Sequence, residues 1–425
     1  MTTILSSFCN LIWGAPMIIL ALGAHLYFTF KTGFIQKHLF AGIKYSIASN
    51  DDKGLSGLQV ISTVLASTIG TGSIVGVASG ILLGGPGTVF WCFVCGLLGI
   101  ATSYAENYLA VKFSVKDTGG IDHGGAFIWF TRVLNKPLLG YWFALCSLGV
   151  GLSMGVTIQS NVLYHSGFPE TPPHVFAAIL AVIVFLSVKG GLKSVANVCT
   201  ALVVPLSVLY LLVCIWLLFH FQNVLWDSVG LIVSHAFSIR PAVFGGVTYS
   251  FVHSMRYGMS RGLFSNEAGL GSVPMVTVKG QGSAKQCALA ACSSVFWDTL
   301  VVCTVTGLVL VCSMISTDQI FDDPIVLLEY TFSSFPVIGS LVFRISIVIF
   351  SYLTIVGWFC SAQQSASNLM GGKNCGWLSL LWSLVAAFGV ITGQSILWSV
   401  ADLLNAAMMI PNLYCLFCLR NEIQT

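Results

Sequence analysis

Charged residues are scarce throughout this chain. Of its 425 residues, 8% are charged and 56% are hydrophobic, whereas a soluble domain carries about 25% charged residues. The mean hydropathy of +0.89 comes from apolar runs along the whole length rather than from one anchor. This deficit excludes a water-soluble enzyme, a nucleic-acid-binding protein and a disordered protein. It indicates an all-α polytopic membrane protein that has the lipid bilayer as its surroundings.

Two further absences narrow the functional class. Residues 1–10 lack a basic segment and a small-residue cleavage site, so we expect the first apolar run to stay in the mature protein. The pairs Cys92/Cys95 and Cys415/Cys418 have C-x-x-C spacing but lie in apolar runs without neighbouring histidines, which favours buried thiols over a metal or redox centre. No nucleophile elbow or metal-spaced His/Glu set is present. We therefore expect neither a cofactor nor an enzymatic activity.

Apolar runs of membrane-spanning length make up most of the chain. A helix needs roughly 20 mostly apolar residues to cross a bilayer. By this rule the sequence predicts eleven transmembrane helices, near residues 10–30, 56–84, 86–114, 137–165, 172–188, 191–221, 241–268, 284–314, 337–370, 375–393 and 395–418.

The basic residues predict the orientation. With the N-terminus outside, all but four of the 18 basic residues fall in cytoplasmic loops or in the C-terminal tail, as the positive-inside rule requires. The exceptions are Arg240, Arg256, Arg261 and Arg344. We therefore expect a protein of the cell (inner or plasma) membrane with an external N-terminus and a cytoplasmic C-terminus.

The predicted helix 56–84 carries glycines in its middle. Gly70, Gly72 and Gly76 are interspersed with the hydroxyl residues Thr71 and Ser73. Unwound backbone at membrane depth survives only where it is buried in protein or lines a wet cavity, and there its free N–H and C=O groups are able to bind ligands. Close packing of small residues against another helix is the competing interpretation. The neighbouring hydroxyls favour a break that binds a ligand.

A second candidate break lies in the predicted helix 241–268, at Gly245 and Gly246. The two breaks then fall in the first and sixth helices after the N-terminal one, as in two five-helix inverted repeats with a site at the bilayer midplane. This arrangement predicts an N-terminal helix with a cytoplasmic amphipathic loop (1–55), a first repeat (56–221), an external connector (222–240), a second repeat (241–418) and a cytoplasmic tail (419–425).

Broken helices recognise ligands without charged side chains. Half-helix N-termini attract a carboxylate, and half-helix C-terminal carbonyls attract a hard cation. No Lys or Arg lies at mid-depth in the predicted helices 56–84 and 86–114. This favours a small zwitterion, such as an amino acid, over an inorganic anion.

Four carboxylates fall in predicted helices or at their ends: Glu106, Glu267, Asp298 and Asp402. Burying a charge in a membrane is costly, so each needs a partner or a function. For Glu106 and Glu267 the favoured interpretation is an ion pair with Lys or Arg at the inner boundary. A gate or a proton carrier is the alternative for all four.

Two long stretches form distinctive motifs. Residues 70–91 begin Gly-Thr-Gly-Ser-Ile-Val-Gly, and residues 261–274 read Arg-Gly-Leu-Phe-Ser-Asn-Glu-Ala-Gly-Leu-Gly-Ser-Val-Pro. Both stretches resemble the signature of the alanine or glycine:cation symporter family. Shorter agreement at 159–161, 298–304 and 354–358 extends the resemblance over nearly the whole chain. The resemblance implies a leucine-transporter-like 5+5 inverted-repeat core of ten helices after one extra helix. It also implies import of a small neutral amino acid, alanine (D or L) or glycine, together with Na+.

The resemblance also implies site residues. It assigns to the substrate the first break, the facing break and three pocket residues, which are Thr71, Gly72, Ser73, Gly245, Gly246, Gln159, Asn161 and Trp358. It assigns to Na+ the carbonyl groups of Ala66 and Ile69 and the hydroxyl of Thr354. The stretch with Arg261, Asn266 and Glu267 is placed at the cytoplasmic end, where an inner gate is the expected role.

Two departures from the family pattern concern the cation. Ser73 stands where Asn is common, and Leu353 stands where a second hydroxyl residue is usual. Ser351, one turn before Thr354, is a candidate to supply the missing oxygen. Otherwise the coupling ion is H+, with Asp298 or Glu106 as its carrier.

Two further departures concern the substrate. Phe244 and Tyr249 stand where small residues are common. If they fill the pocket, they favour glycine or alanine over larger amino acids, while a helix-facing Tyr249 is equally compatible with the sequence. A membrane-embedded enzyme and a passive channel are the competing functional classes.

Overall fold

The computed structural model describes residues 9–424 except 10, 48–54, 117–121, 239–241, 245, 246, 318, 374 and 393. For residues 242–244, 247–249 and 394–396 it describes the backbone alone.

The chain is helical over most of its described length. The α-helices are α2 (Ala15–Lys31), α3 (Leu39–Ile47), α4 (Gly57–Thr68), α5 (Val77–Gly84), α6 (Gly87–Lys112), α7 (Ala126–Ile128), α8 (Pro137–Val150), α9 (Ile158–Gly167), α10 (Pro173–Val188), α11 (Gly191–His220), α12 (Gln222–Ala236), α13 (Phe251–Asn266), α14 (Val273–Thr277), α15 (Ala284–Val295), α16 (Thr304–Ile315), α17 (Pro324–Ser333), α18 (Gly339–Leu369), α19 (Leu378–Ile391) and α20 (Gln394–Cys418). The π-helical segments are η2 (Gly72–Gly76), η3 (Trp129–Val133), η4 (Gly151–Thr157) and η5 (Phe296–Cys303), and the 3₁₀ segments are η1 (Ile35–His38) and η6 (Arg420–Glu422). The strands β1 (Val115–Lys116) and β2 (Asp122–His123) pair antiparallel, as do β3 (Ala242–Phe244) and β4 (Val247–Tyr249).

The helices agree closely with the apolar runs of the sequence. Six continuous helical stretches in the described residues are long and apolar enough to cross a membrane, or up to eight if each of two bent pairs is counted as one span. The helices α10 and α19 fall below that length, with 16 and 14 residues. The prediction of a multi-pass membrane protein is therefore confirmed. The number of eleven membrane crossings stays a prediction.

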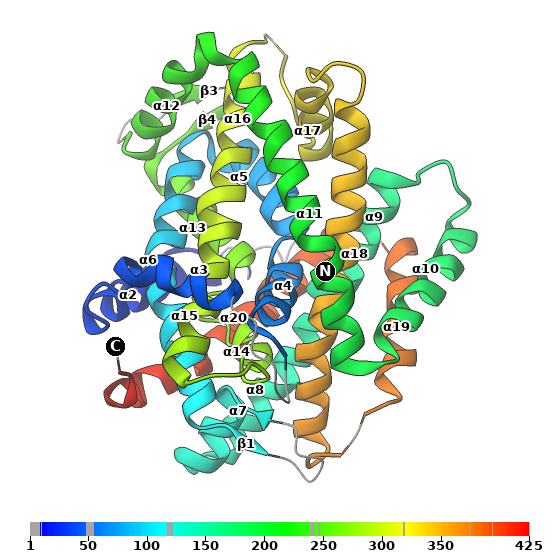
Figure 1. Ribbon diagram of the computed structural model, residues 1–425. Coiled ribbons are helices and arrows are strands. Elements are labelled where there is room, and N and C mark those ends of the chain that lie inside the picture. The colour runs from blue at the N-terminus through cyan, green and yellow to red at the C-terminus, as the bar shows by residue number, and fades with distance from the viewer. Residues whose placement is uncertain are drawn as a thin grey trace.

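Figure 1 shows the helices arranged between two ends of the molecule. The helix α12, the strands β3 and β4, and α17 gather at one end, while β1 and α7 lie at the other. The helix α4 lies in the middle, with α5 above it, and the long helix α18 runs past α4. The centre of the molecule is therefore built from the interrupted helix and its neighbours.

The helix predicted at 241–268 is shorter than expected. Residues 242–244 and 247–249 form the strand pair, and α13 begins only at Phe251. The local sequence explains this difference, because Val, Thr and Tyr favour strands and glycine weakens a helix. The prediction that this helix starts at residue 241 was wrong.

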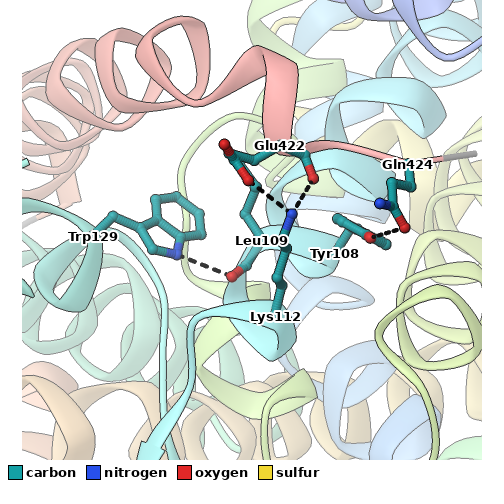
Figure 2. A network of polar contacts seen from close by, with 6 residues as sticks. All are labelled: Tyr108, Leu109, Lys112, Trp129, Glu422 and Gln424. Atoms are coloured by element: carbon teal, nitrogen blue, oxygen red, sulfur yellow. Dashed lines mark hydrogen bonds and ion pairs between the residues drawn. The ribbon is translucent and has the colours of Figure 1, made fainter. Parts of the chain in front are cut away.

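The C-terminal tail docks on the end of α6 (Figure 2). The Lys112 ammonium donates to the backbone carbonyl of Glu422 at 2.8 Å and to its carboxylate at 2.9 Å. The hydroxyl of Tyr108 donates to the side-chain oxygen of Gln424 at 3.1 Å, and that of Tyr104 donates to the Gln424 carbonyl at 2.7 Å. Because Tyr104, Tyr108 and Lys112 are spaced by four residues, they lie on one face of α6.

Candidate functional site

The predicted break in the helix 56–84 is present. The helix α4 starts with a reciprocal capping box between Ser56 and Gln59 and ends at Thr68. At Ile69 the backbone leaves the helical region (φ −76°, ψ 89°), which turns its carbonyl group away from the helical direction. The helical stretch Gly72–Gly84 then continues at an angle of 50° to α4. The glycine-rich middle of this helix is therefore an interruption rather than only a packing surface.

The first break lies against the middle of α18. A Cβ atom on Gly70 would meet the hydroxyl oxygen of Thr354 at 2.3 Å, so glycine is required for this approach. One turn further along α18, a Cβ atom on Gly357 would lie 2.8 Å from the backbone nitrogen of Ser67. The backbone of the broken helix and the surface of α18 are thus in direct contact at two successive turns.

One of the two predicted polar pocket residues on α9 reaches the break. The Gln159 side-chain oxygen accepts a hydrogen bond from the Thr71 backbone N–H at 3.4 Å. In contrast, the Asn161 amide donates to the carbonyl groups of Gly389 and Thr392 at 3.2 and 2.7 Å. Two residues apart on a helix means roughly 200° around it, so the two side chains face opposite ways. The Asn161 amide thus contacts the end of α19, and the assignment of this residue to the pocket stays a prediction.

The facing break lies at residues 267–272. The helix α13 ends at Asn266, Glu267 has a left-handed backbone (φ 56°), and Gly269 and Gly271 have φ values of 91° and 81°. The helix α14 resumes at Val273. All residues of this segment are buried.

The sequence prediction placed the facing break at Gly245 and Gly246. Those two residues lie outside the described part of the chain. Their neighbours lead into the first turn of α13, and there the His253 carbonyl packs against Gly84, at the far end of α5. Gly84 lies about 20 Å along the helical stretch from the first break. The residues Phe244 and Tyr249 belong to the strands that precede α13, and their expected place beside the substrate pocket stays a prediction.

The second break is held by neutral donors. The Glu267 carboxylate accepts from the Ser272 hydroxyl at 2.5 Å and from the Trp358 indole N–H at 3.0 Å. The Glu106 carboxylate of α6 accepts from the Gly269 backbone N–H at 2.5 Å and from the Asn412 amide at 3.0 Å. The predicted ion pairs of Glu106 and Glu267 with Lys or Arg were therefore wrong. Backbone N–H groups freed by the break take the role of the cation.

The two breaks are joined through one buried carboxylate. Asp298 lies in η5, and its two carboxylate oxygens accept from the hydroxyls of Ser73 and Ser265, each at 2.5 Å. The two hydroxyl oxygens are 2.9 Å apart. Ser73 directly follows the first break and Ser265 directly precedes the second. The side chain of Ser73, expected at the substrate, is thus engaged with Asp298 instead.

The gate candidates Arg261 and Asn266 lie on α13. The Arg261 side chain lies against Gly80 of α5 and over the Trp398 ring of α20, whose centroid is 5.6 Å away. It therefore flanks α5, while the N-terminal half of the broken helix, α4, lies on the other side of the break. The Asn266 side-chain oxygen accepts from the backbone N–H of Ala268 at 2.9 Å and caps the end of α13. On the predicted orientation this position of Arg261 is on the outer side, and its assignment to an inner gate stays a prediction.

The four predicted cation ligands lie on the two elements that meet at the first break. Ala66 and Ile69 belong to the end of α4, and Ser351 and Thr354 belong to α18. The Thr354 hydroxyl donates to the Phe350 carbonyl at 3.0 Å, which leaves its oxygen lone pairs available. The Ser351 hydroxyl is fully buried and has no hydrogen-bond partner among the described residues.

Two interrupted helices that meet on a third are an arrangement found in known transporters. The family model of the sodium:alanine symporter family matches residues 1–425. The chain belongs to this family. It is similar to the sodium/alanine symporter AgcS of Methanococcus maripaludis, with 33% identity over 96% of this chain and 93% of that protein. It is also similar to a probable sodium/glutamine symporter, GlnT, of Bacillus subtilis, with 30% identity over 98% of this chain and 88% of that protein.

Solved structures show the fold of this transporter. The chain is similar to MhsT in complex with L-phenylalanine (TM-score 0.54, 15% identity, 87% of this chain and 90% of that chain). It is also similar to a manganese transporter of Eremococcus coleocola (TM-score 0.53, 15% identity, 86% and 79%). Both neighbours share the leucine-transporter-like fold with this transporter. At these identities the similarity concerns the fold alone.

The family motif at 261–274 contained the signal for the second break. In it, Gly269 and Gly271 alternate with apolar residues and are preceded by Asn266 and Glu267, which is the same mixture of glycine and polar residues that marks the first break. The pair Gly245–Gly246 gave an equally strong local signal. Nothing in the sequence pattern of a single helix says which glycine cluster faces the other break.

Proposed function

We propose that this transporter imports small neutral amino acids, alanine of either hand and glycine, by symport with Na+. The observation that carries the proposal is the first break, where unwound backbone, the buried Thr71 hydroxyl and the surface of α18 meet. The substrate and the ion are then both bound by backbone groups and neutral oxygens.

The substrate carboxylate is assigned to the start of the second half of the broken helix. The Thr71 hydroxyl is buried and has no partner among the described residues, and the Thr71 N–H makes only a long bond to Gln159. The N–H groups of a helix start and its positive dipole end favour a carboxylate. A Cβ atom on Gly72 would lie 2.7 Å from the Phe264 ring. This close packing leaves little room beside Gly72, which favours a substrate with a small side chain.

The cation is assigned to Ala66, Ile69, Ser351 and Thr354. Hard cations prefer oxygen ligands, and the residues offer two backbone carbonyls and two hydroxyls. The unpartnered oxygen of Ser351 compensates for Leu353, which supplies none. An ion at this point holds α4 to α18, so its binding favours the conformation in which the two are in contact.

The names of related proteins support the choice of ion more strongly than the choice of substrate. AgcS is named a sodium/alanine symporter and GlnT a probable sodium/glutamine symporter, so sodium is common to both names and the amino acid differs. We assign alanine and glycine because buried aromatic rings, those of Phe264 and Trp358, lie beside the two breaks.

Proton coupling is the second candidate, and Asp298 favours it. This carboxylate is fully buried between the two breaks, and among the described residues its donors, Ser73, Ser265 and Thr299, are all hydroxyl groups. A proton on Asp298 would change its bonds to both breaks at once. The proposal also includes the topology. We propose that the protein lies in the cell membrane with an outer N-terminus and a cytoplasmic C-terminus, and that its core consists of the two repeats 56–221 and 241–418.

Counterflow in proteoliposomes tests the proposed function. Labelled alanine and glycine are exchanged with and without a Na+ gradient, and in the presence of a protonophore. We expect accumulation that needs the Na+ gradient and persists with the protonophore. Loss with the protonophore alone supports proton coupling, and equilibration without accumulation supports a passive channel.

Two variants locate the site. Thr71→Val removes the unpartnered hydroxyl, and we expect it to abolish alanine uptake while the protein remains in the membrane. Thr354→Ala is expected to raise the Na+ concentration for half-maximal uptake. Normal alanine uptake by Thr71→Val removes the substrate assignment, and an unchanged Na+ dependence of Thr354→Ala removes the cation assignment.

A further inference from the structure

A small polar cavity lies beside the broken helix. Its walls come from the N-terminal segment, here Cys9 and Trp13, and from α13 and α20. Its volume is about 160 Å³, room for roughly five water molecules at about 30 Å³ each. Arg256 and Arg261 contribute positive charges to its wall, and Asp402 contributes a negative charge. Such a set of charges is unusual within a chain that has so few of them.

Contacts of Arg261 in the cavity wall lead to the second half of the broken helix. The Cδ atom of Arg261 and the carbonyl oxygen of Thr71 lie 3.8 and 3.7 Å from the position that a Cβ atom of Gly76 would occupy. The Trp398 ring lies over Arg261 and is 5.2 Å from the Phe264 ring between centroids. Phe264 in turn packs on Gly72. The Phe264–Trp398 pair therefore connects Arg261 in the cavity wall to Gly72, next to the first break.

The guanidinium of Arg261 is not fully satisfied by the described part of the protein. Arg256 and Arg261 both act electrostatically on Asp402. The Nε–H group of Arg261 is nevertheless buried without a partner among the described residues. A buried donor without an acceptor is unfavourable, so the cavity is better satisfied when a ligand brings a carboxylate. Because guanidinium groups and a carboxylate share one small space, the complementary ligand carries both a negative and a positive charge.

The N-terminal segment completes the wall of this cavity. The Trp13 indole N–H donates to the backbone carbonyl of Asp402 at 2.9 Å, and the Cys9 thiol donates to that of Ser399 at 3.2 Å. The segment therefore fixes the part of α20 that carries Asp402. The N-terminal segment, which lies outside the predicted ten-helix core, thereby contributes to the site.

We propose that the cavity is an outer binding site for the zwitterionic amino acid, in which Arg256 and Arg261 bind the carboxylate and Asp402 binds the ammonium group. The amino acid is held there before the Phe264–Trp398 pair moves aside and gives access to Thr71. The inference rests on the proposed function, because it requires an amino acid as substrate.

Cysteine protection tests the outer site without the central one. Ser260 lines the cavity and is partly exposed. The full-length Ser260→Cys variant also carries Thr71→Val, which disables the central site, and Cys9→Ala and Cys418→Ser, which remove the thiol in the cavity and the exposed thiol among the described residues. Labelling with a neutral maleimide is then timed in proteoliposomes. Gel filtration and thermal melting identify a variant that has not folded.

We expect saturating alanine to slow labelling at least fivefold. Propionate and ethylamine, which each carry one of the two charges, are expected to have no such effect at the same concentration. A labelling rate that alanine leaves unchanged overturns the outer site, and so does equal protection by propionate. Uptake by the wild-type protein tests the proposed function by itself, so the two failures are distinguishable.

Charge variants with the central site intact supply a second measurement. Arg261→Gln and Asp402→Asn are each expected to raise the KM for alanine about tenfold, with a maximal rate within twofold of the wild type. Arg344→Gln is the matched control, because Arg344 forms an exposed ion pair with Glu329 at 3.4 Å, and its KM is expected to be unchanged. A lower maximal rate with an unchanged KM in Arg261→Gln indicates a structural role and overturns the proposal.

Discussion

Thr354 and Trp358 lie one turn apart on α18, and each contacts a different interrupted segment. The Thr354 hydroxyl faces Gly70 of the first break, and the Trp358 indole donates to Glu267 of the second. Both breaks are therefore at the same depth on one continuous helix. A movement of α18 relative to one break therefore also changes its contacts with the other break. Coupled binding of two ligands needs such a connection between their sites.

Gly70→Ala is expected to abolish uptake. Its Cβ atom would lie 2.3 Å from the Thr354 hydroxyl oxygen, so α4 and α18 would have to separate, and overpacking of this kind costs about 1–3 kcal/mol. Gly76→Ala is the matched control, because its Cβ atom would meet its nearest neighbour at 3.7 Å, an ordinary contact. Uptake and melting temperature are measured for both. Equal activity of the two variants contradicts the close contact.

Ser351→Ala is expected to raise the Na+ concentration for half-maximal uptake at least about tenfold. The variant loses the contact between the hydroxyl oxygen and the ion, and a hydrogen bond to a charged group contributes roughly 1.5–3 kcal/mol. Ser346→Ala provides the control. Its hydroxyl is also buried on α18 without a partner among the described residues, but it is not a predicted ligand. A similar shift in both variants points to general destabilisation of α18 and removes Ser351 from the cation site.

Asp298→Asn is expected to lower uptake at least tenfold. Its two oxygens both accept hydrogen bonds, from Ser73 and Ser265, whereas an amide has one acceptor and one donor group, so one serine has to accept instead of donate and the negative charge between the breaks is lost. Asp227→Asn, on the exposed face of α12, is expected to be neutral. If transport by Asp298→Asn is unchanged, the carboxylate neither joins the breaks nor carries a proton.

Removal of the tail after Leu419 is expected to lower the melting temperature by a few degrees and to leave the half-saturating alanine and Na+ concentrations unchanged. The truncated chain loses the contacts of Tyr104, Tyr108 and Lys112 (Figure 2). Lys112→Met alone is expected to cost less than about 1 kcal/mol, since Glu422 is half exposed and exposed ion pairs are weak. A large change in alanine affinity on truncation shows instead that the tail acts on transport.

Several features of the site were readable from local sequence. The break at 69–71 was predicted from Gly70 and its hydroxyl neighbours, since glycine lowers the cost of unwinding wherever it lies. The position of Gln159 at this break agrees with the family resemblance. The contact of Asn161 with α19 was not readable, because the motif gives the spacing of two residues and not the direction in which a helix face points.

The sequence by itself determined that the chain is a multi-pass transporter, where most of its helices begin and end, and that the helix 56–84 is interrupted. These properties depend on hydropathy and backbone flexibility, which are summed over neighbouring residues. Only the tertiary structure decided that the facing break is at 267–272, that Glu106 and Glu267 are held by neutral donors, and that Arg261 lies beside Asp402. Each of these depends on which helix packs against which, and such pairing joins residues far apart in the chain, such as Glu106 with Gly269 and Arg261 with Asp402, that no local pattern connects.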